Sequence, residues 1–193
     1  VLPRLSAVLR AEAPGVKLVI APFSDRLGSS EEPASLQIRL TWGDERPPGI
    51  RSQRLLTDSF VVLMRRGHEA ARAPMTVEHY ASLNHIKVSA AAVGTTIIDD
   101  SLANRGLERN VVLTVPHWIE VPSIIERTDL VAVVPARWCQ SDNRLTRFST
   151  ASLPLDEVTL NVDQCWDSRR DRDPAQRWLR QRIAKIFAGQ DSS

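Results

Sequence analysis

Short runs of β-branched and other apolar residues alternate with helical patterns along almost the whole chain, and this alternation constrains the fold more than any other feature. The run at 130–134 has five consecutive apolar residues and ends at Pro135, which is typical of a strand buried on both faces. Shorter or alternating runs predict further strands at 16–20, 36–42, 55–64, 86–88, 111–115 and 158–162. Strands that alternate with helices predict an α/β fold with largely parallel pairing.

The segments between these runs carry helix signals. Leu5 and Leu9 follow Leu2 at helical spacing, which predicts an amphipathic opening helix. The last helix has the clearest start, with Asp173 as N-cap and Pro174 at the first helical position. Further short helices are predicted after the cap Thr76, from Ile97 to the terminating Gly106, and from Pro122 onward.

The charged residues are nearly balanced, with 25 Lys and Arg against 23 Asp and Glu and a net charge of +2. This balance is too even to build a nucleic-acid-binding surface on charge alone, so any DNA contact is expected elsewhere. No apolar stretch approaches the ~20 residues that cross a bilayer, and the first residues do not resemble an export signal. The sequence therefore predicts a globular cytoplasmic protein that does not associate with membranes.

Motifs for catalysis, metals or cofactors are not found. Cys139 and Cys165 belong to no C-x-x-C pair and stand beside no histidine at metal-ligand spacing. No nucleophile turn, P-loop, zinc-protease or dinucleotide motif occurs, and Asp99 and Asp100 are acids of the kind that the first turn of a helix favours. We therefore expect a protein that is not an enzyme and has no catalytic residue, metal or cofactor.

Several short segments, taken in order, resemble the effector-binding domain of LysR-type transcriptional regulators. They lie at 2–10, 13–16, 60–68, 114–116, 128–135 and 173–180, and together they span nearly the whole chain. The family's domain is similar to type 2 periplasmic binding proteins, with two Rossmann-like α/β lobes joined by crossing strands. The resemblance implies that lobe I comprises residues 1–67 and 152–193 and that lobe II comprises residues 68–151.

The chain departs from the family pattern at two places. The family has a strand ahead of the helix that begins here at Leu2, inside the first lobe's sheet, and this sequence does not contain it. Residues 26–35 stand where the family usually has a helix with a more apolar face. Both departures fall on the first lobe's side of the expected cleft.

Open α/β sheets bind ligands beyond the carboxyl ends of their strands, so residues directly after strands are candidate ligand-binding residues. Thr41, Trp42 and Gly43 close the strand at 36–42 and would bring a hydroxyl, an aromatic face and a glycine to the mouth of the cleft. The alternative is that Trp42 only covers the core.

The segment 89–96 follows the strand at 86–88 and is the stronger candidate. Ser89, Thr95 and Thr96 can donate hydrogen bonds near the start of the next helix, and Gly94 permits close approach of the backbone. An effector that bears a carboxylate would fit this segment. An ordinary turn between a strand and a helix is the alternative.

His117 and Trp118 follow the strand at 111–115 and would face the same cleft. His117 could titrate near neutral pH, and Trp118 could stack on a flat ligand. A lone histidine in a turn can equally be an ordinary polar surface residue. Pro135 ends the buried strand and is expected on the floor of the cleft.

The resemblance implies a sensor in which a small effector between the lobes shifts an existing equilibrium between lobe arrangements. The segment 89–96 favours an acidic effector. It also implies a homodimer paired through the helices from Leu2 to Arg10 and from Ile97 to Arg105. DNA would be contacted only by an N-terminal helix-turn-helix outside this sequence. Two alternatives stay open: an extracytoplasmic solute-binding protein, which needs an export signal, and an enzyme on a similar scaffold, which needs a reactive group of residues.

Overall fold

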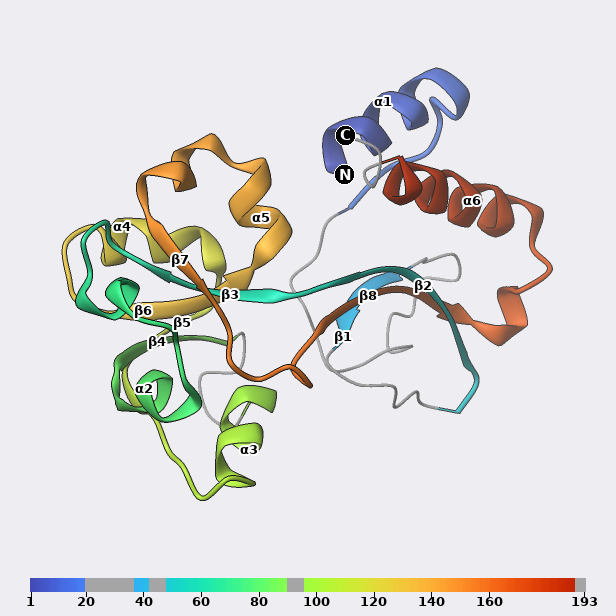
Figure 1. The fold of residues 1–193 in the computed structure, drawn as a ribbon. Helices are drawn as coiled ribbons and strands as arrows, with labels where there is room; N and C mark the ends of the chain where they lie inside the picture. Colours follow the sequence, from blue (N-terminus) through green and yellow to red (C-terminus); the bar gives the residue numbers. More distant parts are fainter. Residues whose placement is uncertain (20–36, 42–47, 90–95, 190–193) are drawn as a thin grey trace. The chain divides into compact units, whose positions relative to one another are not determined.

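The computed structural model describes residues 1–19, 37–41, 48–89 and 96–189, with the side chains of 37–41 left out. The chain forms two compact units, one from Val1–Thr57 and Asn161–Ser193 and one from Asp58–Leu160 (Figure 1). It passes from one unit to the other twice, within β2 (Ile50–Asp58) and at the start of β8 (Leu160–Asp167). In this part of the chain, no helix is both long and apolar enough to span a membrane.

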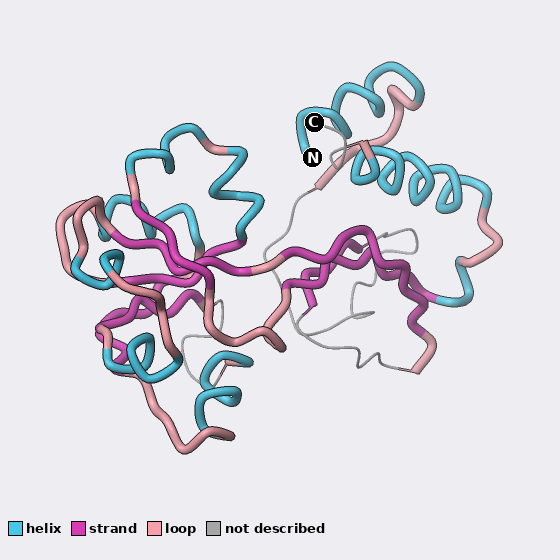
Figure 2. Tube along the Cα trace, viewed as in Figure 1, coloured by secondary structure: helices cyan, strands magenta, loops and turns pink. Residues whose placement is uncertain are grey.

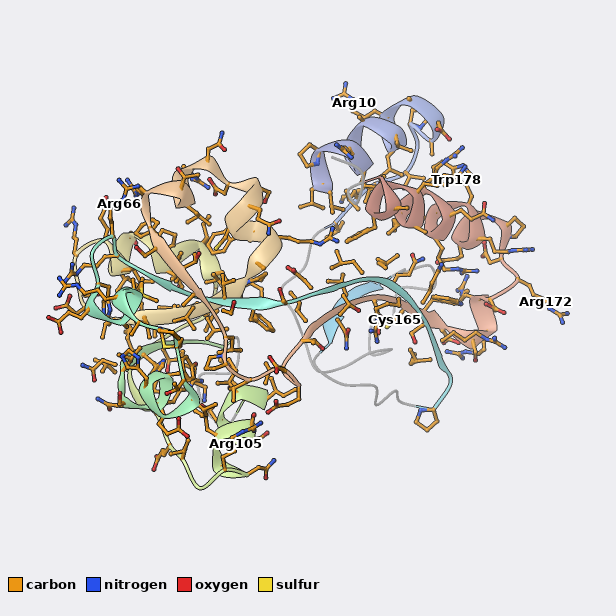
Figure 3. All side chains as sticks on the ribbon, in the orientation of Figure 1. Arg10, Arg66, Arg105, Cys165, Arg172 and Trp178 are labelled. Atoms are coloured by element: carbon orange, nitrogen blue, oxygen red, sulfur yellow. The ribbon has the colours of Figure 1, made fainter. Side chains whose placement is uncertain are left out.

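The first unit combines a small sheet with a pair of helices. Its strand order is β1-β8-β2, and β1 (Gln37–Thr41) pairs antiparallel with β8. The helices α1 (Leu2–Glu12) and α6 (Pro174–Ala188) pack against each other, with Leu5 and Leu9 of α1 buried. Arg182 of α6 lies 2.5 Å from the carboxylate of Glu12 and 5.6 Å from the ring of Trp178, which Figure 3 labels. A short 3-10 turn, η4 (Ser168–Arg170), joins β8 to α6.

The second unit is built on a mixed sheet in the order β5-β4-β6-β3-β7. Its strands are β3 (Phe60–Met64), β4 (Asn84–Val88), β5 (Asn110–Val115), β6 (Val131–Pro135) and β7 (Ser149–Ser152). The strand β4 is parallel to both β5 and β6, whereas β3 is antiparallel to both β6 and β7. Three neighbouring strands therefore point the same way, and their carboxyl ends form one edge.

Helices cover both faces of this sheet. Figure 1 shows α2 (Val77–Ser82) and α3 (Ile97–Ala103) on one face and α4 (Val121–Ile125) and α5 (Ala136–Ser141) on the other, and Figure 2 marks the same helices in cyan. Three 3-10 turns, η1 (Glu69–Arg72), η2 (Trp118–Glu120) and η3 (Asn143–Arg147), complete the unit. On the α4 face, Leu63, Ile86 and Ile125 belong to one buried apolar cluster. All five residues of β6 are buried, as the apolar run predicts.

The predicted helix boundaries are confirmed where an N-cap side chain or a terminating glycine marks them. The Asp173 carboxylate accepts the amides of residues 175 and 176 and so starts α6. The Thr76 hydroxyl caps α2 by accepting the amide of residue 79. Gly106 has φ of 70° just after α3, the left-handed conformation in which glycine avoids the strain of a side chain.

Two fold predictions need correction. The pairing is mixed rather than largely parallel, because β3 runs antiparallel to β6 and β7, and β1 runs antiparallel to β8. The predicted strand at 16–20 does not form over 16–19, and residue 20 lies outside the described residues. There Val16 and Val19 are exposed, so burial supplies no reason for this segment to become a strand.

The compact units have other boundaries than the lobes that the resemblance implies. Residues 58–67 and 152–160 were expected in lobe I, but they belong to the second unit. The strand β3 explains much of this difference, because it is hydrogen-bonded between β6 and β7 and so cannot leave their sheet. The assignment of functional lobes stays a prediction.

Candidate functional site

The carboxyl ends of β4, β5 and β6 bring several predicted ligand-binding residues to one edge of the second unit's sheet. Ser89 follows β4, and its amide donates to the carbonyl of Val115, the last residue of β5, at 2.9 Å. Pro135 is the buried last residue of β6. Because these strands are parallel neighbours, residues that are far apart in the sequence converge here.

His117 and Trp118 extend this edge from β5. His117 is exposed and directly precedes η2. Trp118 is half-buried, packs against the apolar cluster, and donates from its indole nitrogen to the carbonyl of Val133 at 3.2 Å. His117 is therefore accessible to a solute, whereas part of Trp118 covers the core.

Thr96 lies at the N-terminus of α3, where a capping box with Asp99 holds it. The Thr96 hydroxyl and amide both donate to Oδ2 of Asp99, at 3.0 and 2.8 Å, and the Asp99 amide donates back to the hydroxyl at 3.4 Å. A hydroxyl has one hydrogen to donate. Thr96 can donate to a ligand only if Asp99 releases that hydrogen, so this role stays a prediction.

Two cations contact the same carboxylate. Arg109 donates from Nε to Oδ1 of Asp99 at 2.8 Å, and Lys87 Nζ lies 3.2 Å from Oδ2. Burial raises the pKa of Asp99, but the charge of Arg109 and the hydrogen bond from Thr96 outweigh it and hold this pKa below its usual value. Asp99 therefore stays ionised and bound to its partners at neutral pH.

A buried acid that sequence reasoning did not identify as a site residue, Asp58, lies where β3 begins beside the end of β6. Its two carboxylate oxygens accept the amide of Ser59 at 2.9 Å and the amide of Arg137 at 3.2 Å. Burial, and then the charge of Asp58, raise the pKa of the Cys139 thiol to about 11. Cys139 is therefore a neutral thiol at physiological pH and a poor nucleophile.

The other predicted site residues are not placed by the structure. Trp42, Gly43, Gly94 and Thr95 lie outside the described residues, and Thr41 is described only as the last backbone position of β1. Their roles stay predictions. Among the residues that are described, no three His, Cys, Asp or Glu side chains group closely enough to hold a metal ion.

Sequence reasoning missed the Lys87, Asp99 and Arg109 group as well as Asp58. The one available signal was Asp58 itself, a single acid between two apolar runs. Asp99 was interpreted only as an acid favoured by a helix start, and its partners were not predicted. The structure brings together Ser89, Thr96, His117, Trp118 and Pro135 within one unit, and it adds these charged groups beside them.

Comparisons with known proteins agree on one family. The profile described as "LysR substrate binding domain" matches residues 1–188. The HTH-type transcriptional activator NahR of Pseudomonas putida is 31% identical over 191 residues, which cover 96% of this chain and 62% of NahR. The chain thus spans less than two thirds of the length of this curated relative.

Solved structures show the same fold. The regulatory domain of MexT, a transcriptional activator in Pseudomonas aeruginosa, is 28% identical with a TM-score of 0.77, over 96% of this chain and 90% of that domain. The BenM effector binding domain, solved with its effector benzoate, has a TM-score of 0.62 at 13% identity, over 81% of this chain and 71% of that one. The likeness to BenM shows the fold alone.

Proposed function

We propose that this chain, which belongs to the LysR substrate-binding domain family, is the effector-sensing part of a cytoplasmic transcriptional regulator. The observation that carries the proposal is the family match over residues 1–188. DNA contact is assigned to a helix-turn-helix in another segment, which is in keeping with the balanced charge of this chain. An enzyme or an extracytoplasmic solute-binding protein is not favoured, because NahR and MexT are transcriptional activators.

We place the effector at the carboxyl ends of β4, β5 and β6, in contact with Ser89, His117 and Pro135. The proposal also includes Trp118 and Thr96, and it retains the predicted contacts of Thr41, Trp42, Gly43, Gly94 and Thr95. The effector is a small carboxylic acid. The side chains of Lys87 and Arg109 support this class, because these two cations share the single carboxylate of Asp99 and so leave the group with a net positive charge. Binding would stabilise one of two pre-existing conformations and so change how the regulator acts on DNA.

Benzoate, the effector of BenM, is a suitable first probe. We expect it to raise the melting temperature of this chain, whereas benzamide, which has nearly the same shape without the charge, should not. Replacing His117 or Ser89 with alanine should raise the Kd for benzoate by about tenfold, as expected for one lost hydrogen bond to a charged group. Isothermal titration calorimetry measures both Kd values.

A matched control is His79→Ala, which removes the same side chain from α2. It should leave the Kd unchanged. The site assignment is wrong if His117→Ala and Ser89→Ala both bind benzoate as tightly as the wild type. If neither benzoate nor other small aromatic and aliphatic acids bind the wild-type chain, the acidic effector class is wrong.

We also propose that two copies of the chain pair through the helices from Leu2 to Arg10 and from Ile97 to Arg105. Leu2 is exposed on the first of these helices. Val112 and Leu113 are exposed on β5, which follows the second helix in the sequence and forms one edge of its sheet. Exposed apolar residues at a strand edge favour a protein contact, and a second copy supplies the same apolar residues in return.

We expect a homodimer in sedimentation velocity at micromolar concentration. Leu113→Lys should raise the dimer dissociation constant by at least about tenfold, because a charge would be placed in an apolar interface. Ile119→Lys, at an exposed apolar residue of η2, is the matched control and should leave the dimer intact. A wild-type chain that sediments as a monomer at these concentrations would contradict the proposal.

A further inference from the structure

The two units differ in charge, although the chain as a whole is nearly balanced. The first unit, Val1–Thr57 with Asn161–Ser193, has 15 Lys and Arg against 11 Asp and Glu, whereas the second unit has 10 against 12. The even balance counts against a nucleic-acid-binding surface only for the sum of the two units. The excess of positive charge lies in the first unit.

Within the first unit, positive charge is concentrated along η4 and α6. Residues 168–189 contain seven Lys and Arg against two Asp. Two of the seven cations are held by contacts inside the unit. Arg180 is 8% exposed and lies 4.3 Å from the centre of the Trp166 ring, and Arg182 pairs with Glu12 of α1. The other five reach the surface: Arg169, Arg170, Arg172, Arg177 and Lys185.

Three of these surface cations have no ion pair within the described residues, namely Arg172, Arg177 and Lys185. The other two pair with neighbouring aspartates. Arg177, Gln181 and Lys185 are spaced by four residues and therefore share one side of α6. Arg172 lies just before the helix, and Figure 3 shows it pointing outward. We call Arg172, Arg177, Gln181 and Lys185 the basic face.

The chemistry of the basic face fits the phosphate backbone of DNA. Arginine and lysine bind phosphates through charge-assisted hydrogen bonds, and glutamine can donate to a phosphate oxygen. Along the helix axis, Arg177 and Lys185 are about 12 Å apart, so they can contact separate phosphates, which follow each other about every 3.4 Å along a DNA strand. Cations in a row along a helix are typical of nucleic-acid-binding surfaces.

An acidic protein surface is the other partner that such charges would attract. Protein interfaces, however, are usually built around apolar or aromatic anchors. All four side chains of the basic face are polar, and the ring of Trp178 lies against Arg182 instead, at 5.6 Å. The basic face therefore fits DNA better than it fits a protein.

We propose that the basic face is a second DNA-contacting surface, at which Arg172, Arg177 and Lys185 bind phosphates. The contact does not read the base sequence, because phosphates carry no sequence information. It adds to the contact assigned to the helix-turn-helix, which holds this face close to DNA and so lets a weak contact form. Its role in the regulator rests on the proposed function, whereas DNA binding can be measured on this chain alone.

The test is the anisotropy of a fluorescently labelled DNA duplex of about 30 base pairs, titrated with the chain at about 50 mM and about 200 mM salt. We expect a Kd on the order of 10–100 μM at the lower salt, and a slope of log K against log salt of about −3, one unit for each cation. Arg177→Gln combined with Lys185→Gln should bring the slope about two units closer to zero and raise the Kd by at least about tenfold.

The matched control combines Arg66→Gln with Arg127→Gln. It removes the same charge from two exposed residues of the second unit, of which Figure 3 labels Arg66. Its Kd and slope should equal those of wild type. All four substituted residues are exposed, so both double variants should melt within a few degrees of wild type.

Three results would overturn the proposal. The first is a wild-type chain that does not bind the duplex at about 50 mM salt. The second is equal binding by both double variants, which would mean that only net charge matters. The third is a chain that binds poly-L-glutamate but not the duplex, since the basic face would then fit an acidic protein. None of these results depends on benzoate, so a failure of the proposed effector site is seen separately.

Discussion

Replacing Leu63 with alanine is expected to lower the free energy of unfolding by about 3 kcal/mol, because a buried leucine loses its transfer energy and leaves a cavity behind. Leu63 is fully buried on β3, and its strand is hydrogen-bonded on one side to β6 and on the other to β7. It belongs to the apolar cluster that also contains Ile125 and Val134. Because β3 is hydrogen-bonded on both sides, the neighbouring strands cannot easily move to close the cavity.

Urea denaturation followed by circular dichroism measures this change. Ile119→Ala is the control, since it removes apolar atoms from the same unit at a residue that is 61% exposed on η2 and lies outside the proposed dimer contact. Its effect should stay below about 1 kcal/mol. Equal losses for the two variants would mean that β3 is not the centre of this core.

Much of the second unit could be predicted from the sequence because its signals are local. Apolar runs such as Phe60–Met64 and Val131–Pro135 became strands almost where the pattern placed them. Strand direction could not be predicted in the same way. When helices cover both faces of a sheet, a parallel and an antiparallel strand both appear in the sequence as a continuous apolar run. The sequence therefore does not indicate that β3 is antiparallel to β6.

Elements without an apolar pattern were missed. The strand β7 has the sequence Ser-Thr-Ala-Ser, which offers neither alternation nor bulk, and it forms because β3 supplies hydrogen bonds along its edge. The opposite error occurred at 16–19. There the residues favour a strand, but in the described chain they neither pair nor bury Val16 and Val19. Pairing partners, rather than propensity, decide both cases.

The candidate site also has a part that the sequence predicts and a part that it does not. Ser89, His117 and Pro135 could be predicted, because each comes directly after a strand or at its end and the sheet's direction brings them to one edge. The hydrogen bonds that Asp58 and Arg109 make around these residues could not be predicted. Asp58 accepts a hydrogen bond from a residue 79 positions away, and Arg109 reaches back to the start of α3 from the loop before β5. Such contacts depend on the tertiary fold and leave no spacing to recognise.

His85 is expected to make the protein less stable at acidic pH. The side chain is fully buried on β4, with Nε2 2.8 Å from the carbonyl oxygen of Tyr80 and its ring 4.6 Å from the Tyr80 ring. Within the described part of the chain, Nδ1 has no hydrogen-bond partner. A protonated ring would therefore carry a buried charge and a second N–H without an acceptor.

Burial, and then the positive charge of Arg109, lower the pKa of His85 to about 4 from the usual 6.5. Between these values the unfolded chain binds a proton that the folded chain does not, so acidification favours the unfolded state. The stabilisation is complete above pH 6.5 and is lost as the pH falls toward 4. The loss should reach about 3 kcal/mol, since each pKa unit corresponds to about 1.4 kcal/mol.

The clearest comparison is wild type against His85→Gln, whose side chain can still donate to the Tyr80 carbonyl but does not titrate. Urea unfolding from pH 7 to pH 4 should show a smaller loss of stability in the variant, and the difference between the two curves isolates His85 from the carboxylates. An NMR titration of the His85 ring provides an independent measurement. A midpoint near 6.5, or two parallel stability curves, would mean that the folded protein accepts a charged imidazole at this position, and the α2 face of the sheet would then have to admit water or an acceptor beside β4.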